Sequence, residues 1–351
     1  MSESRLVLKD IKKILIIDLA FIGDVLLATP VTRALKKAYP DAAITMMTIP
    51  LTKSMAEMNP YVDDVIVYDK RGKDDGLTGM WRVAQRLKPM QFDLAICMNF
   101  AVRGAVTAWL AGIPHRLGYD AQHAGFFLTM SQSPIRDSIK HETQNHLEVL
   151  RPLGIDDSTA DTSLTLDIPE SANETLKEKS KKNHIPDSGY LVLCPIGSYE
   201  RKNIFQATAA HILHHYSVRR AIFLIGGKTD EHRLSEIAKL ARLPSNNVLA
   251  GTLNLKELAA FLKNADCLIT CDTGPMHIAQ AVGCRTIALF GPTDPKVWGP
   301  RGEHDVILTT PFDCSPCWGK GKCSHAFACV GSTTATEIIK AVDNKGQAIH
   351  G

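Results

Sequence analysis

A strand–turn–helix–strand pattern between residues 265 and 295 constrains the fold of this chain more than any other feature. The apolar run 265–270 has the length of a buried strand, and Asp272-Thr273-Gly274-Pro275 forms the turn after it. An Ala-rich helical stretch and a second apolar strand, 286–290, follow. Two apolar strands joined by a helix are typical of a parallel βαβ unit. Proline suits the first turn of that helix, and the N–H groups there form an anion site that fits a diphosphate.

The same alternation of apolar strands and helical stretches runs along the whole chain and predicts an α/β fold with parallel sheets. Strands are expected at 13–18, 43–48, 65–68, 94–98, 190–194, 221–225, 248–249, 265–270 and 286–290. Helices are expected at 24–38, 52–58, 77–87, 102–111, 142–153, 174–183, 207–216, 230–240 and 255–264. The periodicity weakens over 119–138, where we expect a long loop with one helical turn.

The polar segment 156–169 separates two similar halves and suits a connection between domains. With 351 residues, 45% of them hydrophobic, the chain is long enough for two domains of ordinary size. We expect an N-terminal Rossmann-like domain at 1–168 and a C-terminal one at 169–351, whose last helix can pack back on the first. Because ligand loops follow the carboxyl ends of parallel strands, two such domains predict an enzyme with a central cleft.

Charge and hydropathy argue against several classes of protein. A net charge of +3 is too small to indicate a nucleic-acid partner. No apolar run approaches the roughly 20 residues that span a bilayer. The first ten residues lack the apolar core and cleavage site of a signal peptide. We therefore expect a cytoplasmic protein with at most peripheral contact with the cytoplasmic face of the inner membrane.

The sequences DTGPMHIA, from Asp272, and FGPTDP, from Phe290, resemble the donor-binding motif of the bacterial heptosyltransferases, glycosyltransferase family 9. The resemblance implies a GT-B type fold, in which two doubly wound Rossmann-like domains face a central cleft. It also implies that the second half binds a nucleotide sugar through Asp272, Thr273, Gly274, Met276 and His277. The triplet Asp-Thr-Gly also occurs in aspartic proteases, but those enzymes need two carboxylates that share a proton, and here the triplet occurs once.

The first expected βα turn contains the pair Gly23-Asp24. Family 9 members use the aspartate of a Gly-Asp pair here as catalytic base, so the resemblance gives that role to Asp24 and places Gly23 beside the acceptor. The positive end of a helix favours the ionised carboxylate. Asp24 would accept the proton of the acceptor hydroxyl as the new bond forms. The competing interpretation is an aspartate that caps the helix.

Two further positions are implied by the resemblance in the second half. Relatives carry a small-residue turn and a lysine that contacts the donor diphosphate, which matches Ser198 and Lys202. An acidic residue after the next strand contacts the nucleoside in relatives, and Glu231 or its neighbour Asp230 is the candidate. No Asp-x-Asp triplet, typical of metal-dependent glycosyltransferases, occurs in the sequence. This agrees with a mechanism without metal or cofactor, in which lysine and helix N–H groups hold the leaving group.

The motifs together imply an inverting, metal-independent glycosyltransferase that moves heptose from ADP-heptose to a lipopolysaccharide inner core. Phosphates and carboxylates of such an acceptor could meet basic residues of the first half, although each alone could be ordinary surface. The candidates are Arg103, Arg116, Arg136 and Lys140. Two alternatives stay open: a family 9 enzyme with another nucleotide-sugar donor or a small-molecule acceptor, and a non-catalytic sugar-nucleotide binder.

Four of the nine cysteines cluster near the C-terminus, at Cys314, Cys317, Cys323 and Cys329. Their spacing partly fits a zinc site, while a cytosolic setting argues against disulfides. We expect a reduced, packed loop, with a structural zinc ion as the alternative. The other five cysteines lie in or beside apolar segments and are expected to be buried thiols.

Overall fold

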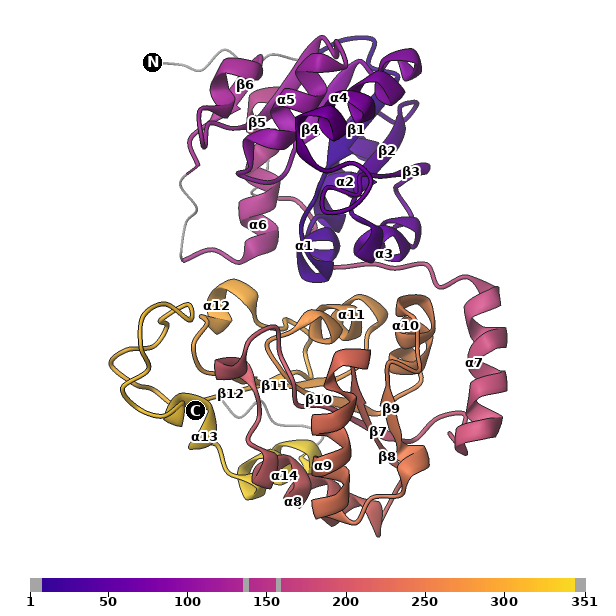
Figure 1. Cartoon of the computed structure of the whole chain (residues 1–351), viewed down its shortest axis with the longest axis vertical. Coiled ribbons are helices and arrows are strands. Elements are labelled where there is room, and N and C mark those ends of the chain that lie inside the picture. Colours follow the sequence, from indigo (N-terminus) through magenta and orange to yellow (C-terminus); the bar gives the residue numbers. More distant parts are fainter. Residues whose placement is uncertain (1–7, 135–138, 156–158, 345–351) are drawn as a thin grey trace. The chain divides into compact units, whose positions relative to one another are not determined.

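The structure is a computed structural model that describes residues 8–134, 139–155 and 159–344 (Figure 1). The chain divides into two compact units, unit 1 (Met1–Asp167) and unit 2 (Ile168–Gly351). Each unit contains a six-stranded sheet in which every pair of neighbouring strands is parallel. Among the described residues, no helix combines the length and the apolar character needed to cross a bilayer.

The sheet of unit 1 has the order β3-β2-β1-β4-β5-β6. Its strands are β1 (Lys13–Ile17), β2 (Ala43–Thr48), β3 (Asp64–Val67), β4 (Leu94–Cys97), β5 (His115–Tyr119) and β6 (Met130–Gln132). Its helices are α1 (Ile22–Leu27), α2 (Thr29–Ala38), α3 (Lys53–Glu57), α4 (Gly76–Leu87), α5 (Val102–Leu110) and α6 (Glu142–Leu147), with 3-10 turns η1 (Pro50–Thr52), η2 (Lys88–Met90), η3 (Ala124–Phe127) and η4 (Glu148–Leu153).

Unit 2 repeats this arrangement with the order β12-β11-β10-β7-β8-β9. Its strands are β7 (Leu191–Cys194), β8 (Ile222–Gly226), β9 (Val248–Ala250), β10 (Cys267–Cys271), β11 (Thr286–Phe290) and β12 (Val306–Thr309). Its helices are α7 (Glu170–Asn183), α8 (Gln206–Ser217), α9 (Glu231–Ala241), α10 (Leu255–Lys263), α11 (Gly274–Val282), α12 (Pro295–Trp298), α13 (Ala328–Gly331) and α14 (Ala335–Asp343), with 3-10 turns η5 (Glu200–Lys202), η6 (Lys228–Asp230) and η7 (Ser245–Asn247).

Both strand orders are those of a doubly wound Rossmann-like sheet, so the predicted α/β class is confirmed. The central strands are buried on both faces: Ile14 and Leu15, which point to opposite sides of β1, are both fully buried. On one face of the unit 1 sheet, Leu15 packs with α4 and α5, for example with Val83 and Ala105. In unit 2, α14 packs on α8 and β11, and Tyr216 of α8 donates to Asp343.

The predicted helix 24–38 is two helices. α1 ends at Leu27 and α2 begins at Thr29, with Pro30 in its first turn. A continuous helix would need an N–H at Pro30 to bond the carbonyl of Leu26, and proline has none. The hydroxyl of Thr29 donates to that carbonyl instead, at 2.7 Å. The proline therefore ends one helix and begins the next within one turn.

The loop expected over 119–138 is wrong in part, because β5 ends at Tyr119 and β6 occupies 130–132. The single helical turn predicted there corresponds to η3. β6 is a short edge strand with exposed or half-exposed residues, so it lacks the apolar run that marks a central strand. The edge strand β12 and the short helices after it also escaped prediction, although β12 contains the apolar run Val306-Ile307-Leu308.

Gly79 of α4 allows the preceding turn to approach the helix closely. A Cβ atom at this position would lie 2.2 Å from the carbonyl carbon and oxygen of Asp74, which are backbone atoms. Alanine normally stabilises a helix by about 1 kcal/mol relative to glycine. Here the steric clash outweighs that gain, because the backbone of the 69–75 turn would have to move.

We predict that Gly79→Ala lowers the free energy of unfolding by about 1–3 kcal/mol, the usual effect of overpacking. Thr78→Ala is the matched control, because Thr78 precedes Gly79 on the same helix and is exposed. Denaturant titration of both variants decides. A Gly79→Ala variant at least as stable as the wild type would show that the backbone of the turn can move at no cost in stability.

Candidate functional site

The candidate site of unit 2 lies where its strand order reverses, between β7 and β10. Ligands of open α/β sheets bind at the carboxyl ends of the strands at such a point. β10 ends at Cys271, Asp272 follows, and α11 begins at Gly274 after the N-cap residue Thr273. The nine-residue helix therefore directs its positive N-terminus to this edge of the sheet.

A buried ion pair holds three loops together at this edge. Lys202 Nζ lies 2.7 Å from Asp272 Oδ2, and the two side chains are only 13% and 7% exposed. The hydroxyl of Thr293, from the turn after β11, donates to the same oxygen at 2.8 Å. Loops from the neighbouring strands β7, β10 and β11 thus meet at one carboxylate. The pair fixes the lysine beside the start of α11.

Gly197 makes this approach possible. A Cβ atom on Gly197 would lie 2.9 Å from the Cβ of Lys202, and the N–H of Gly197 donates to Asn203 Oδ1 at 2.8 Å. The Lys202 ammonium also lies 4.9 Å from the centre of the Tyr199 ring, within the range of a cation–π contact. Ser198 is exposed on the same turn.

The remaining predicted donor residues differ in their surroundings. His277 is buried, and its Nδ1 lies 3.3 Å from Gln280 Nε2 on the same helix. Met276 is fully buried and packs against Ala288 and Phe290, so its side chain supports α11 from the core. Glu231 is exposed at the start of α9, after β8, and pairs with Lys228 at 2.6 Å.

The candidate catalytic residue of unit 1, Asp24, lies half-buried in the first turn of α1, next to Gly23. Its Oδ2 accepts a hydrogen bond from the N–H of Phe21 at 3.1 Å. The capping role considered from the sequence is therefore present. That bond engages one of the two carboxylate oxygens, so capping and a chemical role are compatible.

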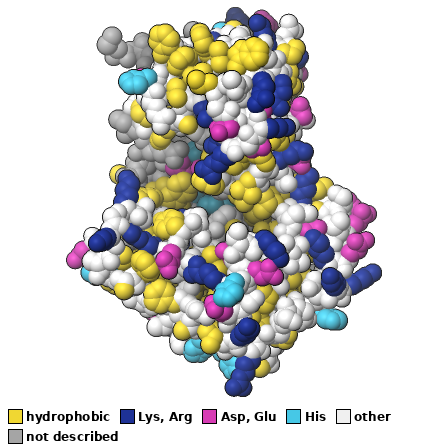
Figure 2. Space-filling view, in the orientation of Figure 1, with side chains coloured by type: hydrophobic (Ala, Val, Ile, Leu, Met, Phe, Trp, Pro, Cys, Tyr) yellow, Lys and Arg dark blue, Asp and Glu magenta, His cyan; other side chains and the backbone are white. Residues whose placement is uncertain are grey.

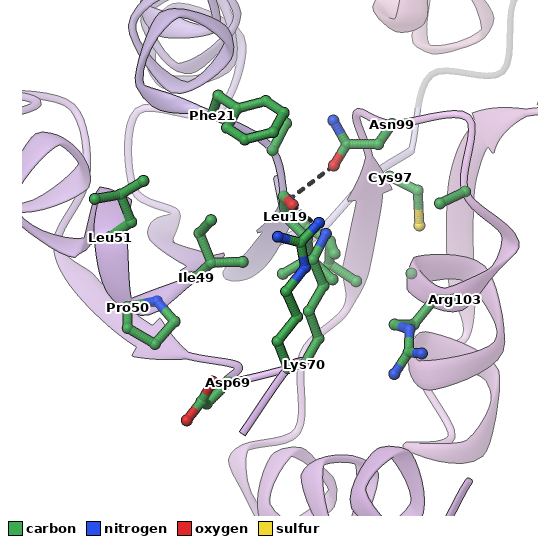
Figure 3. A pocket seen from close by; sticks show the side chains of 15 residues that line it. Leu19, Phe21, Ile49, Pro50, Leu51, Asp69, Lys70, Cys97, Asn99 and Arg103 are labelled. Atoms are coloured by element: carbon green, nitrogen blue, oxygen red, sulfur yellow. Dashed lines mark hydrogen bonds between the residues drawn. The ribbon is translucent and has the colours of Figure 1, made fainter. Parts of the chain in front are cut away.

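A cavity of about 490 Å³ lies beside this helix, at the carboxyl ends of β1 to β4 (Figure 3). Its lining includes Leu19, Phe21, Ile49, Leu51, Lys70, Arg71, Asn99 and Arg103. Figure 3 shows Lys70 extending toward Leu19, whose carbonyl accepts a hydrogen bond from the ammonium. Three cations and an apolar wall suit a ligand that joins anionic groups to a carbon skeleton.

The basic residues predicted to bind the acceptor have different surroundings in the structure. Arg103 lines the unit 1 cavity and donates to the hydroxyl of Tyr68 at 3.1 Å. Arg116 donates to the main-chain carbonyls of Ile113, Pro114 and Phe127, so it braces the β5–β6 connection. Lys140 pairs with Glu148. Arg136 lies outside the described residues.

Lys70, Arg71 and Asn99 are cavity residues that the sequence analysis missed. Asn99 directly follows a predicted strand, and Lys70 and Arg71 come two and three positions after another, at the end where ligand loops gather; this position was the available signal. Burial and the neighbouring cations Arg71 and Arg103 lower the pKa of Lys70. An anionic ligand would offset the repulsion between these cations.

Asp18, directly after β1, is a buried acid beside this region. Its Oδ1 accepts from Asn99 Nδ2 at 3.1 Å and from the N–H of Ala20 at 3.2 Å. Its Oδ2 has no hydrogen-bond partner among the described residues. Burial, and then the negative charge of Asp24, raise the pKa of Asp18 to about 6, although the nearby His146 opposes the shift.

All nine cysteines are free thiols. The five expected to be buried are buried, and burial raises the pKa of Cys97 to about 12. Cys314, Cys317, Cys323 and Cys329 line one small hollow together with His325. Within the described ranges, no three His, Cys, Asp or Glu side chains are grouped so that they could hold a metal ion.

Sequence comparison decides the family. The profile of glycosyltransferase family 9 (heptosyltransferase) matches residues 80–327. The chain belongs to glycosyltransferase family 9. It is a glycosyltransferase, as the motifs predicted, and the family assignment is confirmed.

Individual relatives agree with this assignment. Lipopolysaccharide heptosyltransferase 3 of Escherichia coli is 27% identical over 296 residues, covering 82% of this chain and 85% of the relative. The crystal structure of a family 9 glycosyl transferase from Veillonella parvula superposes with a TM-score of 0.83 at 25% identity, covering 95% of this chain and 96% of the other. E. coli ADP-heptose LPS heptosyltransferase II has the same fold, with a TM-score of 0.79 at 18% identity and coverage of 94% and 97%. The predicted GT-B type fold class is confirmed.

The buried acid of this family 9 chain predicts how stability depends on pH. Folded Asp18 keeps its proton up to a pKa of about 6, against 3.8 for an ordinary aspartate. The folded state therefore binds more protons between these values, so stability falls as pH rises through this window. The difference between these two pKa values corresponds to about 3 kcal/mol.

Asp18→Asn should remove this dependence. We expect the free energy of unfolding of the variant, minus that of the wild type, to rise by about 2–3 kcal/mol from pH 4 to pH 7. Denaturant titrations at several pH values measure it. The exposed residue Asp41 provides the matched variant Asp41→Asn, which makes the same chemical change outside the core. A pH-independent difference for Asp18→Asn would show that Asp18 titrates normally.

The buried ion pair of unit 2 gives a second prediction. Lys202→Met keeps the length of the side chain but leaves the Asp272 carboxylate buried without its cation, which should cost on the order of 3 kcal/mol. Adding Asp272→Asn removes the stranded charge and should recover part of the loss. A double-mutant cycle by denaturant titration measures the coupling. Strictly additive effects would mean that the two charges do not interact.

Proposed function

We propose that this protein transfers heptose from ADP-heptose to the inner core of a lipopolysaccharide, with inversion and without a metal. The observation that carries the proposal is the position of Lys202 beside the start of α11, at the point where the strand order of unit 2 reverses. The names of the relatives supply the sugar and the class of acceptor: one is a lipopolysaccharide heptosyltransferase, another an ADP-heptose LPS heptosyltransferase.

Unit 2 is the proposed donor-binding unit. The diphosphate would accept hydrogen bonds from Lys202 and from first-turn N–H groups of α11, at Thr273 and Gly274. His277, one turn into the helix, would add a donor. Ser198 and Glu231 follow the carboxyl ends of β7 and β8, and would contact the diphosphate and the nucleoside. Asp272 acts through Lys202, whose ammonium it holds in place.

Unit 1 is the proposed acceptor-binding unit. Inner-core sugars of a lipopolysaccharide carry phosphate and carboxylate groups on a large carbohydrate skeleton. Lys70, Arg71 and Arg103 of the unit 1 cavity supply cations for the anionic groups, and Phe21 and Leu51 supply an apolar wall. Arg116 and Lys140 are not part of this proposal, because their hydrogen bonds and charges are engaged elsewhere.

The proposed reaction is a single displacement. The acceptor hydroxyl attacks the anomeric carbon from the face opposite ADP, while the bond to the diphosphate breaks and ADP leaves with the electron pair. Asp24 accepts the proton of the hydroxyl, and its charge compensates the positive charge that builds on the sugar ring. Lys202 and the helix N–H groups stabilise the departing diphosphate, the role that a metal ion has in other glycosyltransferases.

Asp24→Asn tests this function. The substitution keeps the size of the side chain and an oxygen that can accept from the N–H of Phe21, so folding and donor binding should survive. Loss of the base should lower turnover of ADP-heptose with a lipopolysaccharide acceptor by about 10²–10⁴-fold. Donor affinity, measured by calorimetry, should change by less than about tenfold.

Glu337→Gln is the matched control. Glu337 occupies the same position in α14 and accepts from the N–H of Thr334 at 2.7 Å, so the variant makes the same capping change away from the site. It should leave turnover intact. Wild-type turnover in Asp24→Asn would make Asp24 only a helix cap. Lack of turnover by the wild type with ADP-heptose and any inner-core acceptor would overturn the proposed function itself.

A further inference from the structure

Helix α4 of unit 1 exposes large apolar side chains although its other face is buried. Leu77 is 79% exposed and Trp81 is 56% exposed, while Val83, Ala84 and Leu87 are buried in the core. Leu77 and Trp81 are four residues apart, so they lie one above the other on the same side of the helix. Figure 2 shows hydrophobic side chains gathered over α4 and α5, with Lys and Arg side chains beside them.

Cations surround Trp81. Lys73, Arg82 and Arg86 line the same open hollow as this tryptophan. The Arg82 guanidinium donates to the carbonyl of Lys73, and Arg86 donates to Asp74 Oδ2 at 3.0 Å. The Asp74 side chain is only 6% exposed, so a buried acid holds the Arg86 guanidinium in place. The outward surface of the hollow is therefore cationic and partly aromatic.

The segment that contains α4 and the turn before it carries a net positive charge. Residues 69–90 contain six Lys or Arg and three Asp, a net charge of +3, which equals the net charge of the whole chain. Positive charge gathered around exposed leucine and tryptophan matches the surface of an acidic bilayer, where phosphates lie above an apolar interior.

We infer that the α4 face, formed by Lys73, Leu77, Trp81, Arg82 and Arg86, docks on membranes that contain acidic phospholipids. Leu77 and the Trp81 ring enter the interface between headgroups and acyl chains, and the cations bind lipid phosphates. A free phosphate would use the hollow but would give Leu77 no partner. The turn at 69–74 joins this face to the unit 1 cavity, because Lys70 and Arg71 line the cavity and Lys73 lines the hollow.

Vesicle sedimentation tests the inference. The wild-type protein should bind vesicles of phosphatidylethanolamine and phosphatidylglycerol, and bind vesicles of phosphatidylcholine alone much more weakly. Added salt should weaken the binding, because exposed charges are screened. Leu77→Ser combined with Trp81→Ala, and separately Arg82→Gln, should each reduce the affinity for acidic vesicles about tenfold or more.

The controls lie on α9 of unit 2. Leu240 is 62% exposed, so Leu240→Ser removes a comparable apolar side chain, and Lys239→Gln removes a comparable exposed charge. Both should bind vesicles like the wild type. Equal binding of the wild type to acidic and neutral vesicles, or no loss in the Leu77/Trp81 variant, would overturn the inference. Absence of vesicle binding would also overturn it and leave a protein partner as the occupant of this face.

Docking can fail or succeed independently of the proposed function. With a deacylated, water-soluble core acceptor, the Leu77/Trp81 variant should transfer heptose at the wild-type rate, whereas Asp24→Asn should not. Vesicle binding without heptosyl transfer would refute the proposed function and keep the docking surface. Transfer without vesicle binding would do the opposite.

Discussion

The parallel direction of the strands is the constraint on which the rest of this structure depends. In each six-stranded sheet all carboxyl ends share one edge, so every loop after a strand is delivered there. Asp24, Lys70 and Asn99 come from different parts of unit 1, and Lys202, Asp272 and Thr293 from different parts of unit 2. Hydrogen bonds of the ladders fix the strands, and the loops inherit their positions. The positions of the candidate site residues are thus set mainly by the backbone of the sheet.

Charges buried at these sheet edges destabilise the folded state, and the packing of the sheets must offset that loss. Asp18 has one carboxylate oxygen without a partner and lies near Asp24, so the two acids repel each other when both are ionised. Asp272 is better compensated, because a lysine and a hydroxyl share one of its oxygens. Incomplete compensation is typical of functional sites, where stability and chemistry make different demands. Both acids follow strands whose side chains are almost completely buried, and this packing holds them in place.

Local patterns in the sequence predicted most of the central strands and most helices, because burial on both faces leaves a continuous apolar run, as in β2 and β10. The edge strand β6 and the inner strand β5, whose sequence His-Arg-Leu-Gly-Tyr is partly polar, carry no such run and were missed. The turn at Asp272 and the start of α11 were also predicted, since these residues are adjacent in sequence. The contact of Lys202 with Asp272 could not be predicted from spacing, because 69 residues separate them and only the sheet brings them together. The partners of Arg116 and Lys140 could not be predicted either. A basic residue in the sequence does not reveal which carbonyl or carboxylate its side chain will bind.

The turn before α4 closes on itself through hydrogen bonds. The carbonyl of Asp69 accepts from the N–H groups of Gly72 and Asp74, at 3.1 and 3.0 Å, and the Asp74 carboxylate accepts from the N–H of Asp69 at 3.1 Å. These bonds tie the two ends of the turn together. Lys70 lines the cavity and Lys73 lines the outer hollow. The unit 1 cavity and the α4 hollow therefore cannot evolve independently. A substitution that changes the shape of the turn changes both surfaces at once.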